Sequence, residues 1–141
     1  MLAGATPVLV HNCGGQIDYN SDELSNAAFE ARVKSGIGDG RNVAAAHVEG
    51  LDKPIIGFSK GGGYHSENHI LDQLAAKGID PSKITAIYSE RQPCPVCGPL
   101  LDGALSPGTP ITWSVPWGAD AVMNSASNDL LKMMIRAAKG R

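Results

Sequence analysis

Residues 42–89 read NVAAAHVEGLDKPIIGFSKGGGYHSENHILDQLAAKGIDPSKITAIYS, and this stretch decides the fold. Two short runs, 42–48 and 54–59, are rich in small and β-branched residues and predict a pair of strands. After three consecutive glycines, apolar residues recur at helical spacing over 65–77, which predicts a helix. A further apolar run at 84–89 predicts a third strand.

The segment before this stretch adds one helix, and the segment after it begins with another. Residues 14–20 are glycine-rich and polar, so we expect a loop there. Ser21 or Asp22 can cap a helix that runs to about Lys34. Residues 94–105 predict a short helix, because prolines at its start suit a helical first turn.

The C-terminal part supplies a fourth strand at 111–117 and a last helix that begins at Ser125 or Asn128. Helices and strands therefore alternate along the chain. This order favours an α/β fold, a three-layer α/β/α sandwich around a mixed sheet of four or five strands, over a helix bundle or a barrel.

The composition is that of one globular domain. The chain has 141 residues, 43% of them hydrophobic, and a formal net charge of −2. No apolar stretch approaches the roughly 18 residues that a membrane-spanning helix needs. A slightly acidic chain is poorly suited to gripping a long nucleic-acid backbone, so any nucleic-acid contact should be short and local.

The cysteines point to a metal site. Three cysteines are too few, and odd in number, for a disulfide scaffold. Cys94 and Cys97 are three residues apart at the start of a predicted helix, so both thiolates can face one ion. His65 opens the preceding helix. One imidazole and two thiolates leave a zinc ion with an open fourth position, which is typical of a catalytic site. We therefore predict one zinc ion per chain, held by His65, Cys94 and Cys97.

Glu67 follows the histidine by two residues and is the candidate catalytic residue that moves protons. The pattern H-x-E followed by P-C-x-x-C is the general signature of zinc deaminases. A structural zinc site or a cysteine pair without metal is the alternative interpretation. A structural site normally has four protein ligands, and no fourth cysteine is close in the sequence.

Two other histidines form competing patterns. The triplet at 47–49 is also H-x-E, but a turn and a strand follow it rather than a helix, so we expect His47 to be a strand residue near the site and not a ligand. His65 and His69 have the i, i+4 spacing of a metalloprotease motif. That motif requires glutamate directly after the first histidine, where Ser66 stands. We expect His69 to lie on a helix face.

The stretches RNVAAAHVEG, HSENHILDQL and SERQPCPVCGPLL resemble the cytidine deaminase superfamily, and within it the bacterial polymorphic-toxin deaminases. The resemblance implies the strand order 2-1-3-4, with room for a fifth strand, and helices on both faces of the sheet. It also implies a zinc-dependent enzyme that deaminates cytosine to uracil in single-stranded nucleic acid, with DNA favoured over RNA.

Substrate-binding residues follow partly from the resemblance and partly from residue type. Asn42 matches a position where the superfamily often has a sugar-contacting asparagine. The family motif often has alanine between the histidine and the glutamate, and here the backbone N–H of Ser66 is expected to hold the pyrimidine oxygen. Arg91 is a candidate for a phosphate contact. Aromatic side chains suit stacking on a base, and the candidates are Tyr64, Trp113, Tyr88 and Trp117, with Tyr64 and Trp113 taken as site residues.

The N-terminal residues TPVLVHNC resemble the end of a Hint or intein-type self-cleaving domain. Asn12 and Cys13 would then flank a release junction, residues 1–13 would be a remnant, and residues 14–141 would form the deaminase toxin domain. A frayed apolar tail is the alternative. The toxin resemblance implies a monomer that is secreted by one bacterium and acts in the cytoplasm of another, with a cognate immunity protein and no membrane partner.

Two further functions remain open from the sequence. The chain can be a deaminase of free nucleosides or nucleotides. It can also be a non-catalytic binding module that zinc stabilises, in which case Glu67 is incidental.

Overall fold

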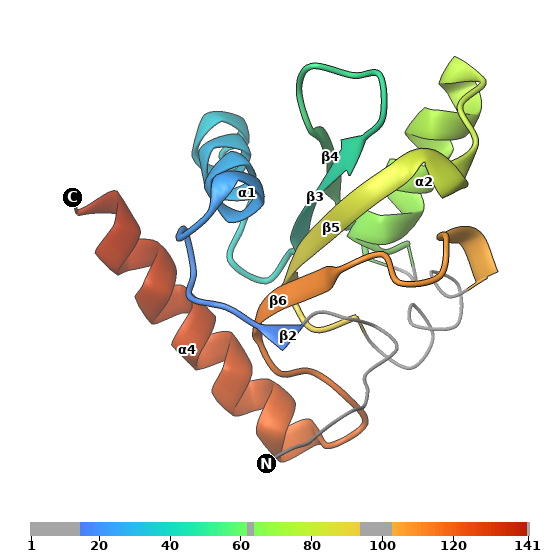
Figure 1. Ribbon diagram of the computed structural model, residues 1–141. Helices are drawn as coiled ribbons and strands as arrows, with labels where there is room; N and C mark the ends of the chain where they lie inside the picture. Colours follow the sequence, from blue (N-terminus) through green and yellow to red (C-terminus); the bar gives the residue numbers. More distant parts are fainter. Residues whose placement is uncertain (1–14, 62–63, 94–102, 141) are drawn as a thin grey trace, which may run out of the picture.

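The computed structural model describes residues 15–61, 64–93 and 103–140. These form one mixed five-stranded sheet with helices on both faces (Figure 1). The elements in chain order are β2 (Gly15–Gln16), α1 (Glu23–Ser35), β3 (Val43–Val48), β4 (Ile55–Phe58), α2 (Ser66–Lys77), the 3₁₀ turn η2 (Pro81–Lys83), β5 (Ile84–Arg91), β6 (Ile111–Val115) and α4 (Ala121–Lys139).

The sheet has the strand order β2-β6-β5-β3-β4. Strand β3 is antiparallel to both β4 and β5, whereas β6 is parallel to β5 and β2 is parallel to β6. The α/β fold class and the order of the four longer strands are confirmed. Since β2 pairs with the outer side of β6, the fifth strand is present and is parallel to its neighbour.

The expectation of a loop at 14–20 was wrong for its first part, because Gly15–Gln16 is strand β2. Its pairing depends on the backbone: the N–H of Ile17 donates to the carbonyl of Trp113 at 2.8 Å. The side-chain amide of Gln16 adds a hydrogen bond to the carbonyl of Ser114 at 2.9 Å. A strand of two residues has no alternating apolar pattern, so the sequence carried no signal for it.

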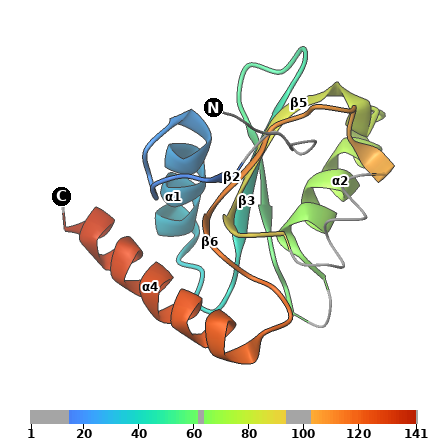
Figure 2. The same ribbon diagram turned by 60° about the horizontal axis from the view of Figure 1, so that its bottom comes forward.

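Helices α1 and α4 cover one face of the sheet and α2 covers the other, as Figures 1 and 2 show from two directions. Strand β3 is buried on both faces, and its residues alternate between two clusters. Toward α2 the cluster includes Ala44, Ala46, Val48, Ile70 and Leu74, and toward α1 it includes Val43, Ala45, Leu24, Ala28 and Tyr88.

Helix α1 begins as the sequence predicts. The Asp22 carboxylate accepts the backbone N–H of Ser25 at 2.9 Å, and the Ser25 hydroxyl accepts the N–H of Asp22 at 2.9 Å. This reciprocal pair satisfies two donors that the helix itself leaves unpaired. At the other end of the helix, Gly36 has the left-handed conformation, with φ 69°, that suits glycine.

Helix α4 begins earlier than the predicted start at Ser125 or Asn128. Asp120 caps it by accepting the N–H groups of Val122 and Met123. Val122 is 79% exposed, so the first turn of this helix has no buried apolar face. The apolar periodicity therefore placed the start of the helix too late.

Several predictions from the sequence fall on residues that the structure does not describe. The release junction at Asn12 and Cys13 lies outside the described residues, as do Cys94 and Cys97 with most of the predicted helix 94–105. Among the described helices, none combines the length and apolar character needed to cross a membrane.

Helix α2 packs closely against β4 at one glycine. A Cβ atom added to Gly57 would lie 2.2 Å from the backbone oxygen of Ser66 and 2.8 Å from Cγ1 of Ile70. Gly57 is buried, and its close approach to Ser66 fixes how the first turn of α2 sits on the sheet. Any side chain at position 57 would push this turn away.

We therefore expect Gly57→Ala to lower the free energy of unfolding by at least about 2 kcal/mol, because the added methyl meets backbone that cannot rotate away. Gly38→Ala is the matched control, since a Cβ there meets nothing within 4 Å. Urea denaturation of the two variants checks this. Equal stability of both would contradict the packing argument.

Candidate active site

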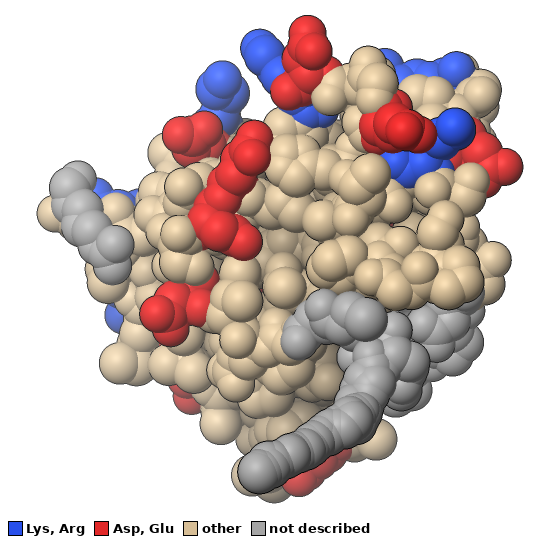
Figure 3. All heavy atoms as spheres, in the orientation of Figure 1, with Lys and Arg blue, Asp and Glu red and all other residues tan. Residues whose placement is uncertain are grey.

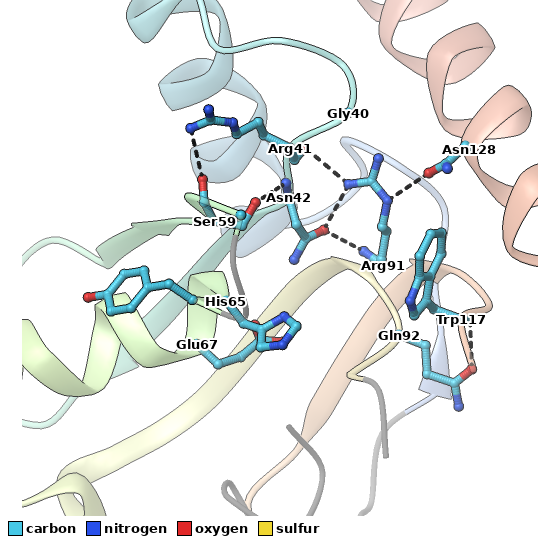
Figure 4. Close-up of a pocket in the computed structure, with 12 residues that line it drawn as sticks. Gly40, Arg41, Asn42, Ser59, His65, Glu67, Arg91, Gln92, Trp117 and Asn128 are labelled. Carbon is cyan, nitrogen blue, oxygen red and sulfur yellow. Dashed lines mark hydrogen bonds between the residues drawn. The ribbon is translucent and has the colours of Figure 1, made fainter. Parts of the chain in front are cut away.

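A cavity of about 240 Å³ opens where the N-terminal end of β3, the C-terminal end of β5 and the start of α2 meet (Figure 4). Sites for drug-sized ligands have volumes of roughly 300–1,000 Å³. This cavity is smaller, and its volume suits a ligand with one small ring. It is lined by Gly40, Arg41, Asn42, Ser59, Gly61, Tyr64, His65, Glu67, Arg91, Gln92, Trp117 and Asn128.

Five site residues that the sequence singled out line this one cavity: Asn42, Tyr64, His65, Glu67 and Arg91. Glu67 lies on α2 and Arg91 on β5, while the other three lie in the segments directly before β3 and α2, so the fold brings them together.

The remaining predicted residues are placed differently. Trp113 lies on β6 as the register partner of Ser89 and does not line the cavity. Trp117, two residues beyond the end of β6, lines it instead. Tyr88 is fully buried in the cluster under α1. The two cysteines lie outside the described residues.

His65 and Glu67 flank the first residue of α2. His65 is the N-cap residue in an extended conformation, and its backbone N–H donates to the side chain of Asn68 at 3.0 Å. Glu67 is only 3% exposed, yet it reaches the cavity. Its Oε1 accepts a hydrogen bond from the Ser66 hydroxyl at 2.8 Å. The helix N-terminus carries partial positive charge, which stabilises a carboxylate there.

Asn42 lies between the start of α2 and the end of β5 and is hydrogen-bonded to both. Its Nδ2 donates to the hydroxyl oxygens of Ser66 and Ser89, both at 2.7 Å. Its Oδ1 accepts the backbone N–H of Arg91 at 3.0 Å and the Nη1 of the same residue at 3.4 Å. Asn42 thus connects β3, β5 and α2.

Arg91 holds the loop that enters β3. Its guanidinium donates to the backbone carbonyl of Arg41, and its Nε donates to Oδ1 of Asn128 on α4 (Figure 4). It also donates to the backbone carbonyl of Asp39. The guanidinium carbon lies 5.5 Å from the centre of the Trp117 ring. Burial lowers the pKa of Arg91, and the negative charges of Glu90 and Asp39 offset this effect only in part.

A buried ion pair lies behind the cavity, on the α1 face of the sheet. Glu90 accepts from Arg32 at 2.9 and 2.6 Å, from the hydroxyl of Tyr19 at 3.0 Å and from the N–H of Val43 at 2.9 Å. Burial opposes the charge on Arg32, but Glu90 outweighs it and raises the pKa of Arg32. Burial and Glu90 also raise the pKa of Tyr19.

This ion pair was not predicted from the sequence, although the sequence of α1 carries a signal for it. Arg32 follows Leu24 and Ala28 at intervals of four, so it belongs to the apolar face of α1. A basic residue on an apolar face requires a buried acidic partner. Asn128 and Gln92, which also line the cavity, carried no comparable signal.

The competing histidine patterns lie elsewhere. His47 contacts the exposed carboxylate of Glu23, and Glu49 pairs with Lys83 at 3.4 Å on the surface. Neither His47 nor Glu49 lines the cavity. His69 lies on α2, where its Nδ1 accepts the N–H of Phe58 at 3.0 Å. Burial, followed by the charge of Lys60, lowers the pKa of His69, so the neutral ring is favoured.

A buried carboxylate and an imidazole beside a small polar cavity define a candidate hydrolytic enzyme site. Residues 39–133, which run from the loop before β3 into α4, match the family model of Xanthomonas-like deaminases. The chain therefore belongs to this deaminase family, and deamination is the chemistry of its class. Neither the curated proteins nor the solved structures give a match.

Proposed function

We propose that this domain removes the amino group from cytosine in single-stranded nucleic acid, DNA in preference to RNA, and that it uses zinc. The observation that carries the proposal is the meeting of His65 and Glu67 at one cavity with Tyr64, Trp117 and Arg91. An imidazole and a buried carboxylate supply the chemistry, while two aromatic rings and a cation suit a nucleotide.

The donor set fits zinc. His65 lies at the cavity, and Cys94 and Cys97 follow the end of β5 at Arg91 by three and six residues in the sequence. Arg91 and Gln92 line the cavity, and Gln92 precedes Cys94 by two residues in the sequence. Among the described residues no group of three potential metal ligands occurs. The proposed set therefore needs both cysteines. When bound by one imidazole and two thiolates, zinc supplies Lewis acidity that activates water at neutral pH.

Glu67 is the proposed proton carrier. Its carboxylate takes one proton from the attacking water and delivers it to the ring nitrogen. It then takes the second proton, from the hydroxyl that the attack leaves on the ring carbon, and delivers it to the departing amine. Water and cytosine thus yield uracil and ammonia. The 3% exposure of Glu67 keeps bulk water away from the carboxylate. Oε1 accepts the hydrogen bond from Ser66, so we assign the proton transfer to Oε2.

The charges around the cavity favour a substrate that carries phosphate. Arg41 and Arg91 line the cavity, and Lys60 lies over the Tyr64 ring at 5.1 Å from its centre. Glu67 is the one carboxylate among the lining residues that the structure describes. The face in Figure 3 carries scattered charges of both signs, without a broad basic patch among its described residues. Phosphate contacts should therefore be few and local.

The biological setting that we propose is delivery between bacteria. It is supported by the resemblance of TPVLVHNC to the end of a self-cleaving domain. In this setting Asn12–Cys13 is the release junction, the toxin acts in the cytoplasm of the target cell, and an immunity protein protects the producer. The active toxin is a monomer.

The first prediction concerns the metal. The purified protein should bind about one zinc ion per chain, measured by elemental analysis. Cys94→Ala and Cys97→Ala should each lose most of the zinc and melt at a lower temperature, because metal binding and folding are coupled. Cys13→Ala is the control and should keep its zinc. Full zinc content in both cysteine variants would show that the ligands are misassigned.

A second prediction separates the two H-x-E triplets. Glu67→Ala should retain zinc and fold, but its rate on single-stranded DNA should fall at least about 100-fold, because the proton carrier is lost. Glu49→Ala should stay within about twofold of the unmodified rate, since removing one exposed ion pair has little effect. The opposite result would move the active site to His47.

The third prediction concerns the form of the substrate. A base in a duplex is sheltered by stacking, and extruding it costs a few kcal/mol. A cavity with few phosphate contacts offers little to offset that cost. We expect much faster deamination of single-stranded than of duplex DNA, with a shallow decline as salt rises. Single-stranded RNA should react more slowly and free cytidine poorly. Sequencing and chromatography of the products measure these rates, and faster turnover of cytidine would favour a nucleoside deaminase.

A further inference from the structure

The hydroxyl of Ser66 is fully buried and links two groups of the site. It accepts a hydrogen bond from Nδ2 of Asn42 at 2.7 Å and donates one to Oε1 of Glu67 at 2.8 Å. We propose that Asn42 and Ser66 form a positioning relay that holds the Glu67 carboxylate in the orientation needed for proton transfer. This inference rests on the proposed function, in which Glu67 moves protons.

The relay assigns Asn42 a role other than sugar binding. An asparagine side chain has two N–H donors and two acceptor lone pairs. In this structure both donors are used by Ser66 and Ser89, and both lone pairs face the N–H groups of Arg91. A substrate hydroxyl would have to displace one of these bonds. Asn42 therefore acts on the reaction through Ser66.

The relay begins at a rigid anchor. Arg91 is 7% exposed and donates to Asn42, to two backbone carbonyls and to Asn128 on α4. With Oδ1 fixed by Arg91, the Asn42 amide cannot flip without losing four hydrogen bonds. Its N–H groups must then point at Ser66 and Ser89, and this orients the Ser66 hydroxyl hydrogen toward Glu67.

The relay gives the two carboxylate oxygens of Glu67 different roles. Oε1 is held by Ser66, which restrains rotation of the carboxylate, and Glu67 lines the cavity. We assign Oε2 to the proton transfer. A glutamate with free side-chain rotation would spend much of its time in unproductive orientations. Proton transfer is sensitive to such misplacement, and an error of about 1 Å can cost 100-fold in rate.

The chain offers a matched control for this relay. Ser66 and Ser89 are both buried, and each accepts one Nδ2 hydrogen of Asn42 at 2.7 Å. No hydrogen bond from Ser89 to Glu67 occurs in the described part of the chain. Replacing either serine by alanine leaves one of the two Nδ2 hydrogens of Asn42 unpaired. Only one of the two replacements releases the carboxylate.

We expect Ser66→Ala to lower kcat on single-stranded DNA by about 10- to 100-fold with KM within about twofold. Ser89→Ala should lose a similar amount of thermal stability and keep kcat within about threefold. A kcat loss of equal size in both variants, or an unchanged kcat in Ser66→Ala, would overturn the relay.

A second comparison tests whether Ser66 acts through Glu67. In a Glu67→Gln background, Ser66→Ala should cause no further fall in single-turnover rate, whereas an independent role would lower the rate again. If Ser66→Ala does not fold, Asn42→Ala tests the same relay. The kcat of Asn42→Ala should fall, whereas the kcat of Ser89→Ala should stay within about threefold of the unmodified value. If Glu67→Ala is as active as the unmodified protein, the proposed function itself fails. If only the serine comparison fails, the relay alone is lost.

Discussion

Glu90 is buried in the middle of the molecule, and the arrangement of the site depends on the hydrogen bonds that it accepts. They come from Arg32 on α1, from the backbone of Val43 at the start of β3, and from Tyr19 in the N-terminal segment. A buried ion pair contributes little net stability once desolvation is counted. Its value here is geometric: it fixes where β3 begins relative to β5.

The next residue extends this constraint to the opposite face of the sheet. Successive side chains of a strand point to opposite faces, so Glu90 faces α1 while Arg91 faces the cavity. Arg91 then binds the carbonyls of Asp39 and Arg41 and the side chain of Asn42. Two adjacent residues of β5 therefore hold the loop before β3 from both sides, and Asn42 is placed without freedom to move.

The sequence predicted the parts of this arrangement that leave a local pattern. Strands, helices and the strand order followed from periodicity and from the family resemblance. Of the two H-x-E triplets, the one at the start of α2 places His65 and Glu67 at the cavity, whereas His47 and Glu49 do not line it. What the sequence could not predict depends on partners far apart in the chain. Arg32 and Glu90 are 58 residues apart, and Asn42 and Arg91 are 49 apart. Trp117 lines the cavity rather than Trp113 because β6 ends at Val115 and the chain then turns toward Gln92, whose side chain accepts the N–H of Trp117.

Core packing and site geometry meet at Ser66. On one side, its backbone oxygen packs against Gly57, where there is no room for a Cβ atom. On the other side, its hydroxyl is held by Asn42. The first turn of α2 thus cannot slide along β4 or rotate about its axis without losing one of these two contacts. His65 and Glu67 lie immediately before and after Ser66, so the position of Ser66 determines where both functional groups lie. The glycine at position 57 and the hydroxyl at position 66 therefore act together: both fix the first turn of α2, and this turn places the His65 imidazole and the Glu67 carboxylate at the same cavity.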